Sequence, residues 1–187
     1  MKKVIVAPLL ALGILGCSSS VPVNSDTTKS IGKVNNALSC WNKLGSKNNI
    51  DNFDDLDFNV FTNQKWDELH KSHAKNVIVH WPDGHTTHGI ERHISDLKKL
   101  FVFAPDTRIL EHPIRISCGN LTTVMGYMEG TFSKPMPIGG GKSIQPTGKK
   151  FRIQMATIGR WGKNGPMDEE WLFWDNKTYM KQIGLGK

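Results

Sequence analysis

The order of helix-type and strand-type segments constrains the fold of this chain most strongly. Up to Phe103, apolar residues recur mainly at helical spacing, most clearly in the stretch from Gly89 to Phe103. One β-branched run, residues 76–81, interrupts this part. Four strand-type runs follow, at residues 107–117, 121–132, 150–161 and 167–174. Helices followed by consecutive strands predict the α+β class, with a meandering antiparallel sheet.

The helical spacing before the first predicted strand is itself interrupted. Between residues 58 and 70, apolar side chains lie at helix-like intervals, with a break near Asn63. We therefore expect two short helices or one kinked helix there. Residues 48–57 are polar, so the main domain is predicted to span residues 51–187.

Residues 1–16 have the pattern of a secretory signal peptide. Two lysines follow Met1, and the apolar run from Val4 to Leu15 is shorter than the roughly 20 residues of a membrane-spanning helix. The segment Ile14-Leu15-Gly16-Cys17 resembles the lipobox of bacterial lipoproteins, in which the cysteine is acylated and becomes the new N-terminus. We therefore predict lipidation at Cys17. The alternative is an ordinary signal peptide followed by a buried cysteine.

The predicted anchor also indicates a location. Position 18 is Ser and not the acidic residue that retains many lipoproteins in the inner membrane, so we expect the periplasm, at the inner leaflet of the outer membrane. Residues 18–30 are polar and aperiodic, and residues 31–44 have the spacing of a short helix. Residues 17–50 are thus predicted to be a lipidated tether with a short N-terminal helix. The lipid at Cys17 would bind this segment to the membrane.

The charge pattern argues against a nucleic-acid partner. The 187 residues carry a formal net charge of +7, which becomes +5 once Lys2 and Lys3 leave with the signal peptide. The remaining cationic residues lie singly or in pairs, whereas nucleic-acid-binding segments usually carry blocks of them. With 38% hydrophobic residues, the chain can form one packed core.

Two cysteines remain besides Cys17. An oxidising periplasm would allow Cys40 and Cys118 to form a disulfide. The sequence does not fix the distance between them, so two free thiols are an equal alternative.

Several short motifs occur in the order of a known family. They are Val79-His80-Trp81-Pro82-Asp83-Gly84, Gly130-Thr131-Phe132, Pro146-Thr147-Gly148-Lys149, and the segment from Glu169 through Trp174-Asp175-Asn176 to Leu185. Together they resemble the SnoaL-like polyketide cyclases, or ester cyclases, of the nuclear transport factor 2-like superfamily. The resemblance implies a cone-shaped curved antiparallel sheet wrapped by helices, with one enclosed pocket. It also implies a homodimer formed through the outer face of the sheet.

The same resemblance implies a cofactor-free enzyme. In the characterised cyclases, one pocket carboxylate acts as general acid and base in an intramolecular aldol closure, with no metal or organic cofactor. We carry this role to Asp175 first and to Glu170 second, with His80 orienting the substrate. The expected reaction is a cyclisation, isomerisation or hydrolysis of a small hydrophobic carbonyl or ester compound. The alternative is a non-catalytic periplasmic lipoprotein that binds an apolar ligand or a protein partner.

Strand alternation gives the predicted pocket wall. Residues 123, 125, 127 and 129 share one face of their strand, and we assign that face to the pocket. The run at residues 150–161 has no clearly polar face and stays unoriented. Either Glu169 or Glu170 must point inward. The predicted substrate-binding residues are Trp81, Met125, Tyr127, Glu129, Met155, Trp171 and Phe173.

Each candidate also has a purely structural alternative. Asp175 precedes a short predicted helix and could be its N-cap. The acidic residues of the strands could pair with Arg152 or Arg160 on a neighbouring strand, and the aromatic residues could belong to the core.

A group of histidines is the only other constellation that we weigh. His80, Asp83, His85 and His88 carry donor atoms that suit zinc, copper or nickel. Their spacing does not match a closed metal site, so we predict solvated or pocket histidines and no metal there.

Overall fold

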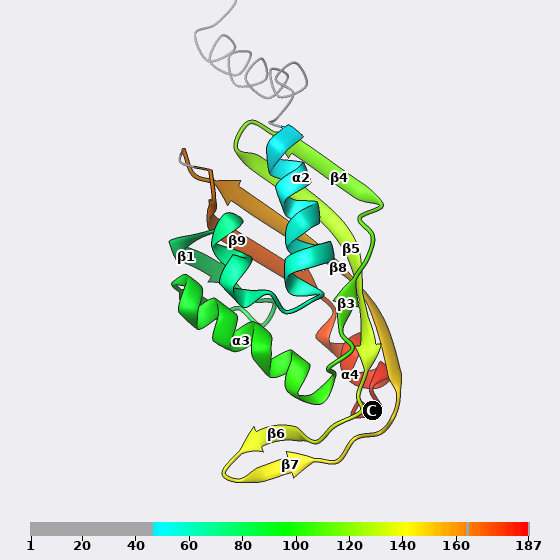
Figure 1. The fold of residues 1–187 in the computed structure, drawn as a ribbon. Coiled ribbons are helices and arrows are strands. Elements are labelled where there is room, and N and C mark those ends of the chain that lie inside the picture. Colours follow the sequence, from blue (N-terminus) through cyan, green and yellow to red (C-terminus); the bar gives the residue numbers. More distant parts are fainter. Residues whose placement is uncertain (1–46, 164, 187) are drawn as a thin grey trace, which may run out of the picture. The chain divides into compact units, whose positions relative to one another are not determined.

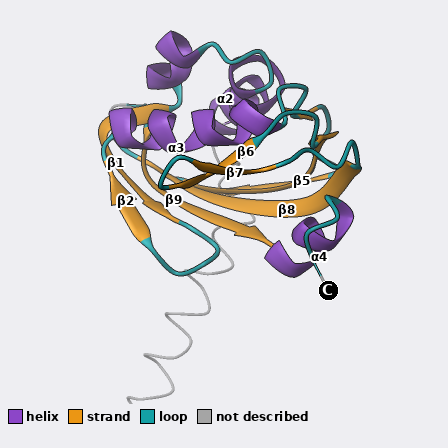
Figure 2. Ribbon diagram, turned by 90° about the horizontal axis from the view of Figure 1, so that it is seen from below, coloured by secondary structure: helices purple, strands orange, loops and turns teal. Residues whose placement is uncertain are grey.

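The fold is built on a curved, mostly antiparallel sheet. A computed structural model describes residues 47–163 and 165–186. The strand order there is β2-β1-β9-β8-β5-β3, and β4 also pairs with β5. Figures 1 and 2 show the long strands side by side and the sheet curving around the helices. The predicted α+β class is confirmed. The strands are β1 (His73–His80), β2 (Thr86–His88), β3 (Arg108–Ile109), β4 (Ile114–Cys118), β5 (Leu121–Thr131), β8 (Lys150–Trp161) and β9 (Met167–Trp174).

The pairing of β1 corrects the predicted meander. Strands β5, β8 and β9 pair with their chain neighbours in antiparallel fashion, as expected. Strand β1 instead pairs in parallel with β9, where Val79 lies opposite Glu170. This pairing joins the first long strand to the last one described, and local sequence patterns carry no signal for it.

The helices cover the concave face of the sheet. Figure 2 shows α2 and α3 on this side, and α4 at one end of β8. Helix α3 begins after Gly89 and ends at Phe103, as its apolar spacing predicts. The helical elements are α2 (Lys47–Asp55), the π-helix η1 (Leu56–Phe61), the 3₁₀-helix η2 (Trp66–Lys71), α3 (Ile90–Phe103) and α4 (Asn176–Gln182).

The segment before β1 is helical and shows which of the two predicted arrangements is present. The chain leaves the helical path between η1 and η2, where Gln64 has φ +54°, so two short helices are confirmed. The polar stretch 48–57 is helical as well, in α2 and the start of η1. Phe53 and Leu56 lie one helical turn apart and are only 1% and 5% exposed, so their burial against the sheet holds α2 in place.

The burial pattern of β5 shows which of its residues face the inside of the sheet. Thr122, Val124, Gly126 and Met128 are buried, whereas Met125, Tyr127 and Glu129 alternate with them on the outer face. The sequence-based orientation of this strand is therefore wrong. Its physical reason is Gly126, because a Cβ there would lie 2.8 Å from the ring of His112, which turns inward from the connection before β4.

We expect Gly126→Ala to destabilise the protein by about 1–3 kcal/mol. The added methyl group has no free space and must displace the His112 ring from its two aspartate partners. Urea unfolding would measure the change. Gln154→Ala, on the exposed outer face of β8, is the control and should change stability by less than about 0.5 kcal/mol. An unchanged midpoint for Gly126→Ala would contradict the inward orientation of His112.

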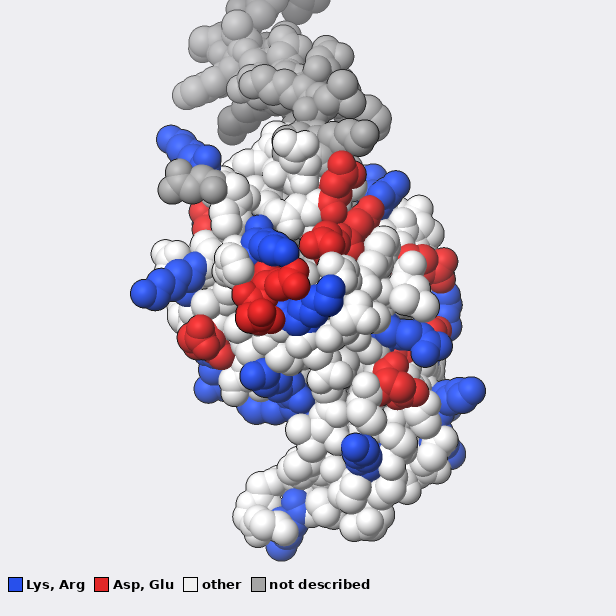
Figure 3. Space-filling view, viewed as in Figure 1, with Lys and Arg blue, Asp and Glu red and all other residues white. Residues whose placement is uncertain are grey.

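The Pro/Gly-rich segment after β5 contains a hairpin of its own. Strands β6 (Met136–Gly139) and β7 (Lys142–Ile144) pair with each other and extend away from the sheet at the bottom of Figure 1. Acidic and basic side chains are intermixed over the face shown in Figure 3.

The predictions for the first part of the chain lie outside the described residues. They concern the signal peptide, Cys17, the tether, the helix at residues 31–44 and Cys40. Within the described part, no helix has both the length and the hydropathy needed to cross a membrane.

Candidate functional site

A cavity of about 180 Å³ lies between the inner face of the sheet and helices η1 and α3. Its walls are mainly apolar, and α3 contributes Leu97 and Leu100. The sheet and its ends contribute Trp81, Met128, Met155, Leu172, Trp174 and Tyr179. An apolar cavity with few polar groups is the usual form of a small-molecule site.

Four ionisable side chains line this cavity in its buried part. Glu170 is 3% exposed and lies between two imidazoles. The distance from its Oε2 to Nε2 of His73 is 3.5 Å, and the distance to Nε2 of His93 is also 3.5 Å. The fourth group is Asp57 of η1. The fold thus brings together residues from β9, β1, α3 and η1.

Two of the carboxyl groups that line the cavity, those of Glu170 and Asp57, lie in different electrostatic environments. Burial opposes the ionisation of Glu170, but the charge and hydrogen bond of His73 prevail and hold the pKa of this carboxyl below its usual value. Burial raises the pKa of Asp57, against the opposing hydrogen bond and charge of His112. Burial also lowers the pKa of His93 to about 4, so this imidazole is neutral at pH 7.

Asp57 is connected to the surface through His112. Nε2 of His112 lies 2.8 Å from Oδ2 of Asp57, and Nδ1 lies 2.8 Å from Oδ1 of Asp54. Asp54 in turn pairs with the exposed Arg115. Burial opposes a charge on His112, but its bonds to the two aspartates prevail and raise the pKa of the imidazole.

Three of the residues predicted for the site line the cavity. They are Glu170, Trp81 and Met155. Trp81 follows β1, and its indole N–H donates to Oγ1 of Thr87 at 2.9 Å, which fixes the ring at the cavity. Of the neighbours Glu169 and Glu170, the second points inward.

Asp175 does not lie in this cavity, which corrects its first rank among the candidates. It is exposed and is the N-cap of α4, where Oδ1 accepts from the backbone N–H groups of Lys177 and Thr178. The hydroxyl and backbone N–H of Thr178 hold the pKa of Asp175 below its usual value. The structural alternative therefore describes this residue.

His80 also lies outside the cavity, on the outer face of the sheet. Its Nε2 is 2.7 Å from Oε1 of Glu169, and its ring stacks on Trp171 with 5.1 Å between centroids. Because residues on one strand alternate between faces, the burial of Val79 directs His80 outward. The prediction that His80 orients a substrate in the pocket is not supported by this position.

The remaining predicted pocket residues lie on the outer face as well. Trp171 and Phe173 alternate with the inward Glu170 and Leu172, and Phe173 is 49% exposed. Tyr127 lies under the guanidinium group of Arg152, which is 3.6 Å from the ring centroid. Met125 is also on this face.

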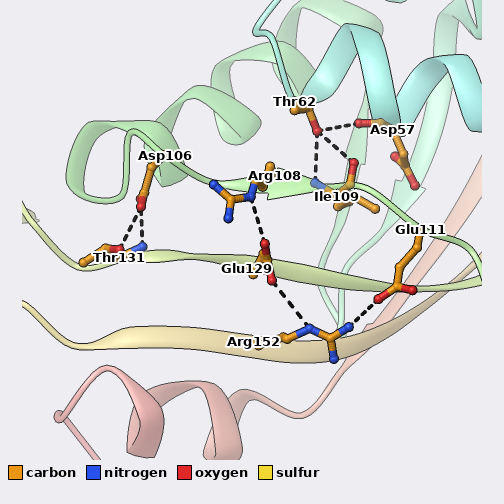
Figure 4. A network of polar contacts seen from close by, with 9 residues as sticks. All are labelled: Asp57, Thr62, Asp106, Arg108, Ile109, Glu111, Glu129, Thr131 and Arg152. Atoms are coloured by element: carbon orange, nitrogen blue, oxygen red, sulfur yellow. Dashed lines mark hydrogen bonds and ion pairs between the residues drawn. The ribbon is translucent and has the colours of Figure 1, made fainter.

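Glu129 takes part in a surface network instead of the pocket. Figure 4 shows it between Arg108 and Arg152, with Nε of Arg108 at 2.8 Å and Nε of Arg152 at 3.5 Å. Arg152 also pairs with Glu111. The cross-strand alternative weighed for Glu129 is therefore the observed arrangement.

The histidine group of the turn after β1 does not converge on one point. His85 pairs with Asp83, and His80 pairs with Glu169. His88 lies on β2 and is exposed. These residues thus form separate pairs and no shared site.

Sequence reasoning missed three of the four buried ionisable residues. His93 gave a usable signal, because it is a polar residue on the apolar face of α3. Asp57 lies in a polar stretch for which no helix or strand was predicted, and His73 lies before the segment interpreted as the first strand. The sequence therefore named one member of the cluster, Glu170.

Comparisons with known proteins agree with this architecture. The family model described as SnoaL-like polyketide cyclase matches residues 54–183. No curated protein matches the chain. Both the sheet and the ionisable cavity residues fall inside the matched segment.

Solved structures with a similar fold come from several bacteria. A candidate SnoaL-like polyketide cyclase from Jannaschia sp. CCS1 has a TM-score of 0.65 at 17% identity, covering 78% of this chain and 96% of its own. IdmH, a candidate polyketide cyclase from Streptomyces antibioticus, has a TM-score of 0.60 at 22% identity, covering 72% and 96%. At these identities the likeness shows a common fold.

Proposed function

The chain belongs to the SnoaL-like polyketide cyclase family, and from this premise we propose that its cavity performs acid/base chemistry on a small hydrophobic carbonyl or ester compound. The observation that carries the proposal is Glu170, a carboxylate that lies 3% exposed in an apolar cavity. The reaction class is a cyclisation, isomerisation or hydrolysis that begins with the removal of a proton.

Glu170 is the proposed base. Its ionised carboxylate accepts a proton from the carbon next to the substrate carbonyl, and the C–H electron pair moves towards the carbonyl oxygen as an enolate forms. Asp57, whose burial favours the protonated form, is the proposed acid that donates to this oxygen. Two carboxyl groups with pKa values displaced in opposite directions are typical of an acid and base pair.

The test does not require the natural substrate. Simple ketones and β-keto esters are incubated with the protein in D2O, and NMR follows exchange of the α-hydrogen for deuterium. We expect exchange with the parent protein and none with Leu97→Trp, which fills the cavity from α3. Binding of such compounds without exchange would contradict catalysis and favour the ligand-binding alternative.

The proposed location is the periplasmic face of a membrane, with the chain anchored through lipid at Cys17. The Gly16-Cys17 junction supports the anchor. The mass of membrane-extracted protein tests acylation. Cys17→Ala should move the protein to the soluble fraction, and an unmodified Cys17 in native protein would contradict the anchor.

The proposed assembly is a homodimer through the outer face of the sheet. Ile114, Ile116 and Phe173 are large apolar side chains that are 49%, 59% and 49% exposed on this face. We expect a dimer at micromolar concentration in light scattering, and a monomer for Phe173→Arg. Val102→Arg, on α3, should stay dimeric. A monomeric parent protein would contradict this assembly.

A further inference from the structure

The spacing between the imidazoles and Glu170 is unusual for hydrogen bonds. An N–H···O bond normally spans 2.7–3.2 Å between heavy atoms, but both Nε2 atoms lie 3.5 Å from the same oxygen, Oε2 of Glu170. One ring nitrogen of His73, one ring nitrogen of His93 and one carboxylate oxygen of Glu170 lie within 4.8 Å of one another. Three donor atoms thus surround one point beside the cavity.

That spacing is close to the separation of ligands around a metal ion. Zinc binds imidazole nitrogen and carboxylate oxygen at about 2.0–2.2 Å, so tetrahedral geometry places two such ligand atoms about 3.3 Å apart. The observed distances exceed this value by only a few tenths of an ångström. The donor set, two imidazoles and one carboxylate, is one that zinc and similar ions accept.

The surroundings of His73 hold its ring so that Nε2 faces Glu170. The hydroxyl group of Ser72 donates to the carbonyl of Leu69 at 3.1 Å, so its oxygen accepts from Nδ1 of His73, 2.9 Å away. Without an ion, Nε2 of His73 is the hydrogen-bond partner of Glu170. A metal ion would replace the proton on Nε2, while Nδ1 keeps its proton and its bond to Ser72. Outer hydrogen bonds of this kind fix the ring of metal-binding histidines.

His93 provides an independent observation. It is 3% exposed, and its Nδ1 is buried without a hydrogen-bond partner among the described residues. A buried imidazole with an unsatisfied nitrogen is costly in a cavity wall. Neither nitrogen of His93 makes a hydrogen bond of normal length, since Nε2 lies 3.5 Å from Glu170, and a metal ion bound at Nε2 would satisfy one of the two.

We propose that His73, His93 and Glu170 bind one divalent transition-metal ion of the zinc type, with the remaining coordination position open to the cavity. This departs from the expectation of a metal-free site. The ion and the proposed reaction compete for Glu170, because a coordinated carboxylate oxygen cannot also accept a proton. Binding is tested directly, so either proposal can fail without the other.

The experiment titrates the full chain, freed of any affinity tag and of metal by a chelator, with ZnCl2 in a calorimeter. We expect one ion per chain. Ser72→Ala removes only an outer hydrogen bond and should lower the affinity for zinc by about 10–100-fold. His93→Ala and Glu170→Gln each remove a ligand and should lower it more. His85→Ala removes an exposed histidine and is the matched control, so it should bind as the parent does.

Loading the metal-free parent protein with Co2+ provides a second measurement. It needs no variant, so the folding of variants does not affect it. The parent protein should show the intense visible bands of a four-coordinate cobalt ion, and anomalous diffraction should place the ion between the two imidazoles and Glu170. No stoichiometric binding, an ion bound at another position, or unchanged affinity in folded His93→Ala would overturn the proposal.

Discussion

Glu170→Gln should lower turnover by ~10²–10⁴-fold on any compound whose α-hydrogen the parent protein exchanges, because the amide cannot accept the proton. Glutamine has nearly the same shape, so substrate affinity should change little. The measurement is the exchange rate by NMR in chelator-treated protein, together with a binding titration of the same compound. A loss in rate at constant affinity is the signature of a missing base, whereas a cavity that has merely collapsed would lose both.

Asp175→Asn is the matched control for this prediction. Asparagine is itself a good N-cap, so neither turnover nor stability should change much. Asp175→Ala should cost about 0.5–2 kcal/mol of stability through the lost cap while the rate per folded molecule stays the same. A large rate loss in Asp175→Asn with a normal rate in Glu170→Gln would restore the first assignment made from the sequence.

The protein should lose about 3 kcal/mol of stability between pH 7.5 and pH 4 through His93 alone. Burial lowers the pKa of this imidazole from 6.5 to about 4. Between these values the unfolded chain binds a proton that the folded protein does not, so the free energy of unfolding falls as the pH falls. Below pH 4 both states are protonated and this contribution stays lost.

The contribution of His93 can be isolated with His93→Leu in the presence of a chelator. Glu170, His73 and Asp96 face His93, and the lowered pKa of Glu170 adds a loss in the same direction at lower pH. The raised pKa values of Asp57 and His112 act in the opposite sense. Urea unfolding across this pH range should show a smaller loss for His93→Leu than for the parent, and an unchanged loss for His85→Gln. Equal slopes for parent and His93→Leu would show that His93 titrates normally.

Local patterns predicted the elements better than the faces they present. The bounds of β8 and β9 are those of the apolar runs, because turn residues stand at both ends of each strand. The orientation of β5 was predicted wrongly because it depends on His112, a residue outside the strand. The ring of His112 packs against Gly126 on the inner face, where a larger side chain has no space. Alternation gives two faces, and only the packing partner decides which one is buried.

The site was harder to predict for the same reason. Glu170 was named because it lies in a family motif on a clear strand. His73 and Asp57 lie at ends of elements, where single-sequence patterns are weakest, and their neighbours in space come from other elements. Asp175 shows the opposite case. It lies in a family motif and carries an ionisable side chain, but that side chain only caps the N-terminus of α4.

The parallel pairing of β1 with β9 has a consequence for biosynthesis. His73 and Glu170 are 97 residues apart in the chain, and they meet only when β9 pairs between β1 and β8. Closing so long a loop is entropically expensive and slow compared with forming local hairpins. On the ribosome, a chain that has reached β8 already holds both imidazoles but lacks their carboxylate, so a product truncated before β9 cannot assemble the buried cluster.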